Sequence, residues 1–492
     1  MRVIVVGAGL GGLSAACHLA GRGHEVVVLE REAVPGGRAG LLELEGYRFD
    51  TGPTVLTMTG VLAGVFAAAG AELADHVSLV PVDPMYRACF ADGTELRVRQ
   101  GRDAMREEVQ RECGATEADA FGRFCDWLTE LYRLVMPNFI DRNFDSPLDL
   151  AWPLAPLVDL VRLGGFRTLV KVVESYFSDQ RLVRLFSFQA MYAGLSPYQA
   201  LATYCVITYM DTVEGVYFPM GGMHAVSRGL AAAAEKAGAT FGYGSSVDRV
   251  LRRTGTTGPV TGVRLQNGEV VTADAVVLNP DLPVAYRTLL PELEAPRTAR
   301  RGNYSPSCVV WLAGAKGPLP AGATHHNIHF GTEWETAFDD LLERGMLMPD
   351  PSILVTSPSF TDPSLAPEGR TSLYVLEPVP NLDGKVDWVY ERDRMKEDLT
   401  RRVALLGYPS DVEVERFFDP SDWERQGMER GTPFALSHRF FQTGPFRPNN
   451  VVSKVPGLVF VGSGTVPGVG VPTVLLSGRL AADRVEGRRP GT

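Results

Sequence analysis

The sequence predicts an α/β fold that begins with a Rossmann-like dinucleotide-binding unit, and three observations near the N-terminus support this. Residues 2–6 form an apolar run without a breaker, which is typical of a buried parallel strand. Three glycines spaced as G-x-G-x-x-G follow at once and open a helix; they are Gly7, Gly9 and Gly12. A second strand, residues 24–30, then ends in the acid Glu30.

Each glycine of this turn has a distinct task. Gly7 permits the tight turn, Gly9 lets the backbone approach a pyrophosphate, and Gly12 lets the helix pack close to the strand. The helix begins near Leu10, so its N-terminal amides face the phosphates. Glu30 stands where a carboxylate accepts both hydroxyls of an adenosine ribose, and its charge disfavours a 2′-phosphate. The alternative is a glycine-rich turn that binds nothing, but the flanking strand, helix and acid favour binding.

A second glycine-rich turn follows the second strand. Gly36 and Gly37 free backbone amides to face phosphate, and Arg38 adds a fixed planar charge. With the first turn, these residues resemble the FAD-dependent amine oxidase and carotenoid desaturase superfamily, in which such motifs together hold FAD. The resemblance implies FAD as cofactor and a first set of binding residues: Gly7, Gly9, Gly12, Glu30, Gly36, Gly37, Arg38, Asp50, Gly52, Pro53 and Thr54.

Composition narrows the class of protein. A chain of 492 residues buries a sizeable core, and we expect more than one domain. The net charge of -10 argues against nucleic acid as a partner and against electrostatic anchoring on anionic lipid, but not against an apolar membrane contact. The six cysteines are scattered, which favours reduced thiols in a cytoplasmic protein. The N-terminus is a strand rather than a cleavable signal, and no apolar run is long enough to cross a membrane.

The next elements follow from local patterns. Residues 60–80 predict a helix and then a strand, and residues 107–136 predict one helix with an apolar stripe. Asp92 and Gly93 lie between two short apolar runs and predict a β-hairpin with a type I′ turn. Residues 215–223 are a turn-rich hinge before a helix that ends at Gly238.

The region 138–188 is unusually apolar. Its stretch 148–158 is broken by Pro153 and Pro156, and helical segments follow over residues 157–177. One interpretation is an apolar surface through which a lipid substrate enters from a bilayer. The pattern alone favours the other interpretation, the core of a helical insertion.

The second half of the chain mixes strands and helices. Strands are expected over 245–252, 260–265 and 269–278, with a hairpin at Asn267 and Gly268. Two further strands are expected over 305–312 and 372–376, and a helix over 390–406. His325, His326 and His329 form a cluster. Because no further ligand pattern accompanies them, we expect histidines of the surface or of a substrate cavity, and no metal site.

The C-terminal tail, residues 457–492, is the second stretch of the sequence that indicates cofactor chemistry. A strand over 458–461, a turn and a helix over 472–485 place a helix N-terminus where it can face an anionic flavin edge. A plain glycine-rich connection is the alternative, but such a tail recurs with the N-terminal motif in the resembled superfamily. The resemblance therefore adds Val247, whose counterpart meets the adenine, and the tail residues Gly462, Gly464, Val471 and Pro472.

The same resemblance implies a discontinuous Rossmann-like FAD-binding domain with an inserted mixed α+β substrate domain and a helical, membrane-facing region. The FAD-binding domain is expected over 1–75, 215–280 and 450–492, and the substrate domain over 76–214 and 281–449, with 138–188 as its helical part.

Three stretches look like those of bacterial phytoene desaturases: residues 279–290, residues 360–382 and the tail. Residues 444–450 fit the same family, and the similarity runs over nearly the whole chain. Family members often carry His where this chain has Val466, so no catalytic role is expected there. The resemblance implies hydride transfer from 15-cis-phytoene, a C40 polyene taken from the membrane, to FAD, giving lycopene or an intermediate. Oxygen or a quinone reoxidises the cofactor, and the protein is cytoplasmic and monotopic on the membrane surface.

The sequence assigns no catalytic residue. Asp149 and Asp159 are acids in the apolar region that could accept a proton, but a solvated helix face is the better interpretation for each. Other reactions on the same scaffold remain alternatives, namely amine or protoporphyrinogen oxidation, carotenoid ketolation, and desaturation of a C30 diapophytoene or a hydroxylated carotenoid. A non-catalytic lipid-binding chaperone of the same fold would be expected to lose Glu30 or the Gly36–Arg38 turn, and this chain keeps both.

Overall fold

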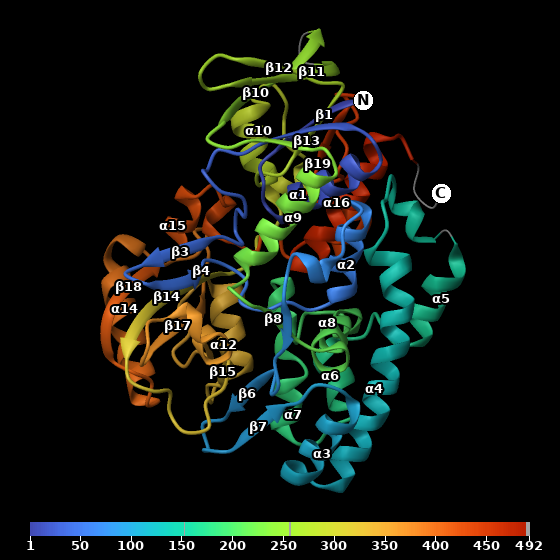
Figure 1. The fold of residues 1–492 in the computed structure, drawn as a ribbon. Helices are drawn as coiled ribbons and strands as arrows, with labels where there is room; N and C mark the ends of the chain where they lie inside the picture. The colour runs from blue at the N-terminus through green and yellow to red at the C-terminus, as the bar shows by residue number, and fades with distance from the viewer. Residues whose placement is uncertain (152, 255–256, 489–492) are drawn as a thin grey trace.

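A five-stranded parallel sheet forms the upper part of the computed structural model, which describes residues 1–151, 153–254 and 257–488 (Figure 1). The strand order is β19-β13-β1-β2-β9, and every pair is parallel. The strands are β1 (Arg2–Val6), β2 (Glu25–Leu29), β9 (Thr240–Gly242), β13 (Ala275–Leu278) and β19 (Leu458–Phe460). The predicted α/β fold with a parallel sheet is therefore confirmed, and its strands come from the start, middle and end of the chain.

Alternating side chains of β1 serve both faces of this sheet. Val3 and Val5 pack with the helices of one face, and Ile4 and Val6 pack with the strands and helix of the other. The first face carries α1 (Leu10–Gly21), α2 (Thr59–Ala68), α9 (His224–Lys236) and α16 (Val471–Val485). The second face carries α10 (Leu282–Leu289) and a three-stranded sheet of β10 (Val247–Thr254), β11 (Thr257–Leu265) and β12 (Val270–Thr272).

A seven-stranded sheet lies to the lower left in Figure 1, in the order β18-β14-β17-β16-β15-β6-β7. Only the β15–β6 pair is parallel within this order. The strands are β6 (Tyr86–Cys89), β7 (Glu95–Val98), β14 (Ser307–Lys316), β15 (His326–His329), β16 (Ile353–Thr356), β17 (Arg370–Val379) and β18 (Asp411–Phe418). Helix α14 (Trp388–Leu405) covers one face through Trp388, Met395 and Leu399, which share a core with Trp311.

The third part is helical and lies to the lower right in Figure 1. It consists of α3 (Arg102–Cys113), α4 (Ala115–Val135), η2 (Met136–Ile140), η3 (Pro147–Ala151), α5 (Leu154–Arg162), α6 (Leu169–Glu174), α7 (Gln180–Leu185), η4 (Phe188–Ala193), η5 (Ala202–Cys205), α8 (Val206–Tyr209) and η6 (Met210–Glu214). Phe121, Phe124 and Phe186 stack in its core. In the part of the chain that the structure describes, no helix is both long and apolar enough to span a bilayer.

Short elements complete the fold. They are β3 (Leu41–Leu44), β4 (Tyr47–Asp50), η1 (Leu73–Asp75), β5 (Leu79–Pro81), β8 (Tyr217–Pro219), α11 (Arg297–Arg301), α12 (Glu335–Asp339), η7 (Asp340–Arg344), α13 (Pro358–Thr361), η8 (Pro363–Leu365), α15 (Pro420–Arg425), η9 (Glu429–Gly431), η10 (Phe440–Gln442) and η11 (Gly444–Phe446).

Three local predictions are wrong in detail. The single helix expected over 107–136 is two helices, because Gly114 has a φ of +94° and ends α3. The strand expected over 269–278 is divided between β12 and β13, which belong to different sheets. The hairpin at Asp92 and Gly93 exists, but only Gly93 has a positive φ, so its loop is not a type I′ turn.

The preferred interpretation of the apolar region is wrong for its first half. Leu148, Leu154, Val158, Val161 and Phe166 are exposed rather than packed in a helical core. The second half fits the interpretation, since Leu169, Val170 and Val173 are buried. Trp152, within the same stretch, lies outside the described residues.

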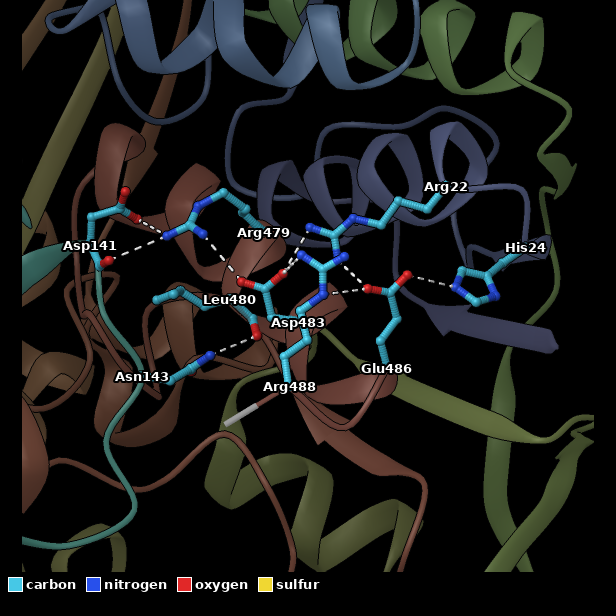
Figure 2. A network of polar contacts seen from close by, with 9 residues as sticks. All are labelled: Arg22, His24, Asp141, Asn143, Arg479, Leu480, Asp483, Glu486 and Arg488. Atoms are coloured by element: carbon cyan, nitrogen blue, oxygen red, sulfur yellow. Dashed lines mark hydrogen bonds and ion pairs between the residues drawn. The ribbon is translucent and has the colours of Figure 1, made fainter. Parts of the chain in front are cut away.

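A polar network fastens the C-terminal helix α16 to both the first helix and the helical part (Figure 2). Arg22, after α1, donates to Asp483 over 2.8 Å and to Glu486 over 3.1 Å. On the other side Arg479 pairs with Asp141, and the Asn143 amide donates to the Leu480 carbonyl over 3.0 Å. These contacts hold the second half of α16 against the two neighbouring parts of the fold.

Candidate functional site

The first glycine-rich turn has the geometry that its spacing predicts. Gly7 has a φ of +95°, and a Cβ on Gly12 would lie 2.1 Å from the Gly7 carbonyl oxygen. Gly9 is the N-cap residue of α1, so the free amides of the helix start at this turn. The tight turn and the close packing of strand and helix therefore both require glycine. Binding of phosphate at this turn stays a prediction.

Glu30 closes the far side of the turn. Its side chain is buried, and its Oε2 accepts a hydrogen bond of 2.6 Å from the Ala8 amide. Oε1 accepts a 3.0 Å hydrogen bond from the Glu32 amide. Each carboxylate oxygen has a second lone pair, so the group retains acceptor capacity for two hydroxyls. Val247 lies near this end, because the Ser245 amide donates to the Glu30 carbonyl over 2.7 Å.

The second turn packs directly on the first. The Gly36 amide donates to the Ala8 carbonyl over 2.9 Å, and a Cβ on Gly37 would lie 3.2 Å from the Gly9 Cα. Gly36 and Gly37 have φ values of +134° and +55°. Two glycine turns without side chains thus face each other across a narrow space.

Arg38 links the second turn to the tail instead of reaching freely toward solvent. Its guanidinium donates to the Ser463 hydroxyl over 2.7 Å and to the Pro433 carbonyl over 3.0 Å. It also pairs with Asp281 over 3.2 Å. The arginine is therefore an anchor among three segments, and its predicted contact with a phosphate is untested.

The run from Asp50 to Thr54 lies behind the second turn. A Cβ on Gly52 would lie 2.0 Å from the Arg38 carbonyl oxygen, so this position also requires glycine. Asp50 is buried and accepts a 3.3 Å hydrogen bond from the His224 amide at the start of α9. Burial raises the pKa of Asp50 to about 7. Pro53 follows in the same loop, and the Thr54 hydroxyl contacts His326 at 3.4 Å.

The tail turn lies beside the first two turns. Gly462 has a φ of +95°, and its amide donates to the Ser477 hydroxyl of α16 over 2.9 Å. A Cβ on Gly464 would lie 2.9 Å from the Leu282 Cβ, which explains the second glycine. Helix α16 begins at Val471, with Pro472 in its first turn, one residue earlier than predicted.

Sequence reasoning missed Asn279, which lies at the junction of the turns. A Cβ on Gly9 would lie 2.6 Å from its Nδ2, and a Cβ on Gly462 would lie 3.2 Å from its Oδ1. The available signal is its position directly after β13, at the carboxyl edge of a parallel sheet.

Two more buried side chains support the tail turn. Arg447 donates to the carbonyls of Thr465 and Ser463 over 3.1 and 2.7 Å, and burial lowers its pKa to about 10. His438 lies against the same loop, with its Nε2 3.4 Å from the Val469 amide nitrogen. No sequence motif singled out either residue.

The histidine cluster does not form a metal site among the residues described here, in which no group of three potential ligands converges. His326 contacts the Thr356 hydroxyl at 2.6 Å, and His329 contacts the Tyr408 hydroxyl at 3.0 Å. Of the two expected alternatives, the surface position is wrong for His325 and His326, which are buried, and the position in a substrate cavity stays a prediction. Burial lowers the pKa of His325 and of His329 to about 4, so both are neutral near pH 7.

The residues present fit a dinucleotide such as FAD. Gly9 packs against Asn279 and Gly37 packs against Gly9, so the two turns come close together only because neither residue carries a Cβ. The helix amides that begin at Gly9 and the buried Glu30 carboxylate border these turns. The Asp281 Oδ1 atom, next to Arg38, is buried and has no partner in the structure, which is common where a ligand or water completes a site.

Comparisons with known proteins show the family of the chain. The family described as Flavin containing amine oxidoreductase matches residues 10–486. The chain is 50% identical to a phytoene dehydrogenase of Streptomyces griseus, covering 99% of this chain and 95% of the relative. It is 38% identical to a zeta-carotene-forming phytoene desaturase of Myxococcus xanthus, covering 98% and 93%. A crystal structure of an oxidoreductase from Methanosarcina mazei shares the fold, with a TM-score of 0.64 at 17% identity over 98% of this chain and 99% of that one.

Proposed function

This chain belongs to the flavin containing amine oxidoreductase family and is an FAD oxidoreductase, and from that premise we propose that it is a carotenoid desaturase. The reaction introduces double bonds into 15-cis-phytoene, giving lycopene or an intermediate. The observation that carries the proposal is the 50% identity, over 99% of the chain, to a relative named phytoene dehydrogenase. The intact Glu30 and Gly36–Arg38 turn favour a flavoenzyme over a lipid carrier of the same fold.

The chain's own residues have the following proposed roles. Glu30 accepts the hydroxyls of the adenosine ribose, and the amides after Gly9 and at Gly37 hold the pyrophosphate, whereas the Gly36 amide is already bonded to the Ala8 carbonyl. The N-terminus of α16, at Val471, faces the ring edge on which negative charge develops. FAD, when bound, supplies the acceptor for a hydride, and the protein supplies orientation and a dry cavity. We keep the proposed division into an FAD-binding domain (1–75, 215–280 and 450–492) and a substrate domain (76–214 and 281–449).

A patch of exposed apolar side chains supports a membrane contact, and we call it the apolar patch. It consists of Leu148, Leu154, Val158, Val161, Phe166, Phe440 and Phe441. The rings of Phe166, which follows α5, and Phe440 of η10 lie against each other with centroids 6.2 Å apart, so these two segments meet within the patch. Large exposed apolar patches on a folded chain mark interaction sites. We propose that this patch rests on a membrane surface, from which the C40 polyene is taken, and that oxygen or a quinone is the final electron acceptor.

An anaerobic mixing experiment tests the proposal. The purified yellow protein is mixed with liposomes that hold 15-cis-phytoene, and the flavin absorbance is followed. We expect bleaching, because two electrons pass from substrate to flavin, together with a product that has more conjugated double bonds. Bleaching by a C30 diapophytoene or a hydroxylated carotenoid, but not by phytoene, would move the substrate to that class. A yellow protein that no polyene bleaches would contradict desaturase function.

A further inference from the structure

We propose that Asp211 is a catalytic base that accepts the proton when the polyene loses two hydrogens. The inference rests on the proposed desaturase function and goes beyond it by naming a residue that no motif indicated. Asp211 lies in η6, which follows α8 and precedes β8 in the chain. Figure 1 shows α8 and β8 near the centre of the molecule.

Asp211 is a buried carboxylate without a cationic partner among the residues described. Its side chain is 7% exposed, and the only side chain that stabilises its charge is the Gln189 amide. The hydroxyls of Tyr86 and Tyr192 also lie within electrostatic range of it. A buried acid normally pairs with a cation, so an unpaired one is costly to keep and marks a functional site.

Tyr192 interacts electrostatically with this acid, and its side chain is half-exposed. Its ring contacts the buried Phe188, which also contacts the buried rings of Phe330 and Tyr86. The surroundings of the acid are therefore aromatic, which suits an apolar polyene.

Unpartnered polar atoms gather in the same two segments. Gln189 Oε1 and Ser187 Oγ, in and just before η4, are buried without a hydrogen-bond partner in the structure. Thr212 Oγ1, next to Asp211, is in the same state. Buried polar groups are nearly always satisfied, so three unsatisfied ones in the segments that carry Gln189 and Asp211 indicate a place that a ligand or ordered water completes.

The other buried or apolar-region acids are engaged elsewhere. Asp149 accepts hydrogen bonds from the amides of Asp145 and Ser146, and Asp159 is exposed and pairs with Arg162. Glu377 pairs with Arg402. Among the residues that the structure describes, Glu117 in α4 is equally buried and has no cation, but its Oε1 accepts hydrogen bonds from the backbone amides of Ser178 and Asp179 over 3.1 and 3.2 Å, as Asp211 does not.

The step balances without a further reactant. The substrate loses one hydrogen with its electron pair as hydride, which FAD accepts, and the neighbouring carbon loses a proton to the Asp211 carboxylate. The electrons of that second C–H bond become the new C=C bond. The protonated acid then returns its proton to water before the next turnover.

Asp211→Asn tests the assignment, with Glu214→Gln in the same short helix η6 as the matched control. Glu214 is the other acid of η6, and the titratable groups that face Asp211 from packed elements are Tyr86 and Tyr192. We expect Asp211→Asn to keep its flavin and its affinity for phytoene in liposomes but to slow anaerobic flavin bleaching about a hundredfold or more. Asp211→Glu should recover part of the rate.

The pH profile separates a base from a structural residue. Burial raises the pKa of Asp211 to about 7, so bleaching by the wild type should slow as pH falls through that value, because the base becomes protonated. Asp211→Asn should lose this dependence, and Glu214→Gln should keep it. If the wild type bleaches and Asp211→Asn bleaches equally fast, the assignment of Asp211 is overturned and the desaturase proposal stands. The same holds if Asp211→Asn bleaches slowly but keeps the pH profile of the wild type. A wild type that no polyene bleaches would overturn the desaturase proposal and this assignment together. If the Asn variant does not fold, an Asp211→Glu variant with an unshifted pH profile would overturn the assignment.

Discussion

The Glu30 carboxylate accepts a 2.6 Å hydrogen bond from the backbone amide of Ala8, inside the first glycine-rich turn. Its other oxygen accepts from the Glu32 amide over 3.0 Å. One side chain therefore fixes both the shape of the turn and the end of β2, at the place where the ribose is proposed to bind. Charge-assisted hydrogen bonds of this kind are worth more than neutral ones.

Replacement of Glu30 by Arg should abolish FAD retention. Two amides lose their acceptor, a cation is placed in a buried position, and the proposed contact with the ribose hydroxyls disappears. The measurement is the ratio of flavin to protein absorbance after purification. Glu32→Arg, the same charge change at an exposed side chain, is the control and should stay yellow. Full flavin content in Glu30→Arg would refute the role given to Glu30.

Gly12→Ala should unfold or strongly destabilise the nucleotide-binding turn. The new Cβ would lie 2.1 Å from the Gly7 carbonyl oxygen, and backbone cannot move away easily. Overpacking of this kind costs about 1–3 kcal/mol and often more. In Gly64→Ala the new Cβ has nothing within 4 Å, and the helix should gain about 0.5–1 kcal/mol. Thermal unfolding compares the two, and equal melting temperatures would contradict the packing argument.

Features that depend on residues close together in the sequence were predicted correctly, whereas contacts between segments far apart in the chain were missed. The roles of Gly7 and Gly12 follow from a six-residue motif, and both match the geometry. Asn279 reaches the turn only because β13 pairs with β1, more than 270 residues earlier in the chain, and no local pattern records that pairing. Leu160 and Val161 are adjacent and equally apolar, yet one is buried and the other exposed. Apolar periodicity alone cannot tell a core from a membrane-facing surface.

Asp50→Asn should make the protein more stable at high pH. Burial raises the folded-state pKa of Asp50 to about 7, above that of the unfolded chain. Stability from the protonated carboxyl is present at low pH and is lost as pH rises through about 7. The advantage of Asn over Asp should therefore grow by about 2 kcal/mol between pH 5 and pH 8.5.

Urea unfolding at the two pH values measures this difference. The exposed Glu235→Gln is the control and should change the free energy of unfolding equally at both. An Asp50→Asn advantage that stays constant with pH would mean that the carboxyl is not charged and desolvated in the folded protein.

Leu154→Ser with Val161→Ser should weaken liposome binding about thirtyfold without changing the melting temperature. These side chains are 57% and 59% exposed, so their loss removes apolar area from the apolar patch but not from the core. Two such side chains contribute about 2 kcal/mol when buried in lipid. Val389→Ser with Tyr390→Ser removes side chains of α14 that are even more exposed, at 86% and 82%, and should leave flotation with liposomes unchanged. If the intact protein never floats with liposomes, the membrane proposal fails.

The most direct measurement is the pigment made when the chain is expressed in a host that accumulates phytoene. The extract is resolved by chromatography, and absorbance spectra count the conjugated double bonds. We predict that colourless phytoene disappears and that red lycopene or a yellow intermediate replaces it, with FAD bound to the purified chain. Unchanged phytoene beside a fully flavin-loaded protein would contradict phytoene as the substrate.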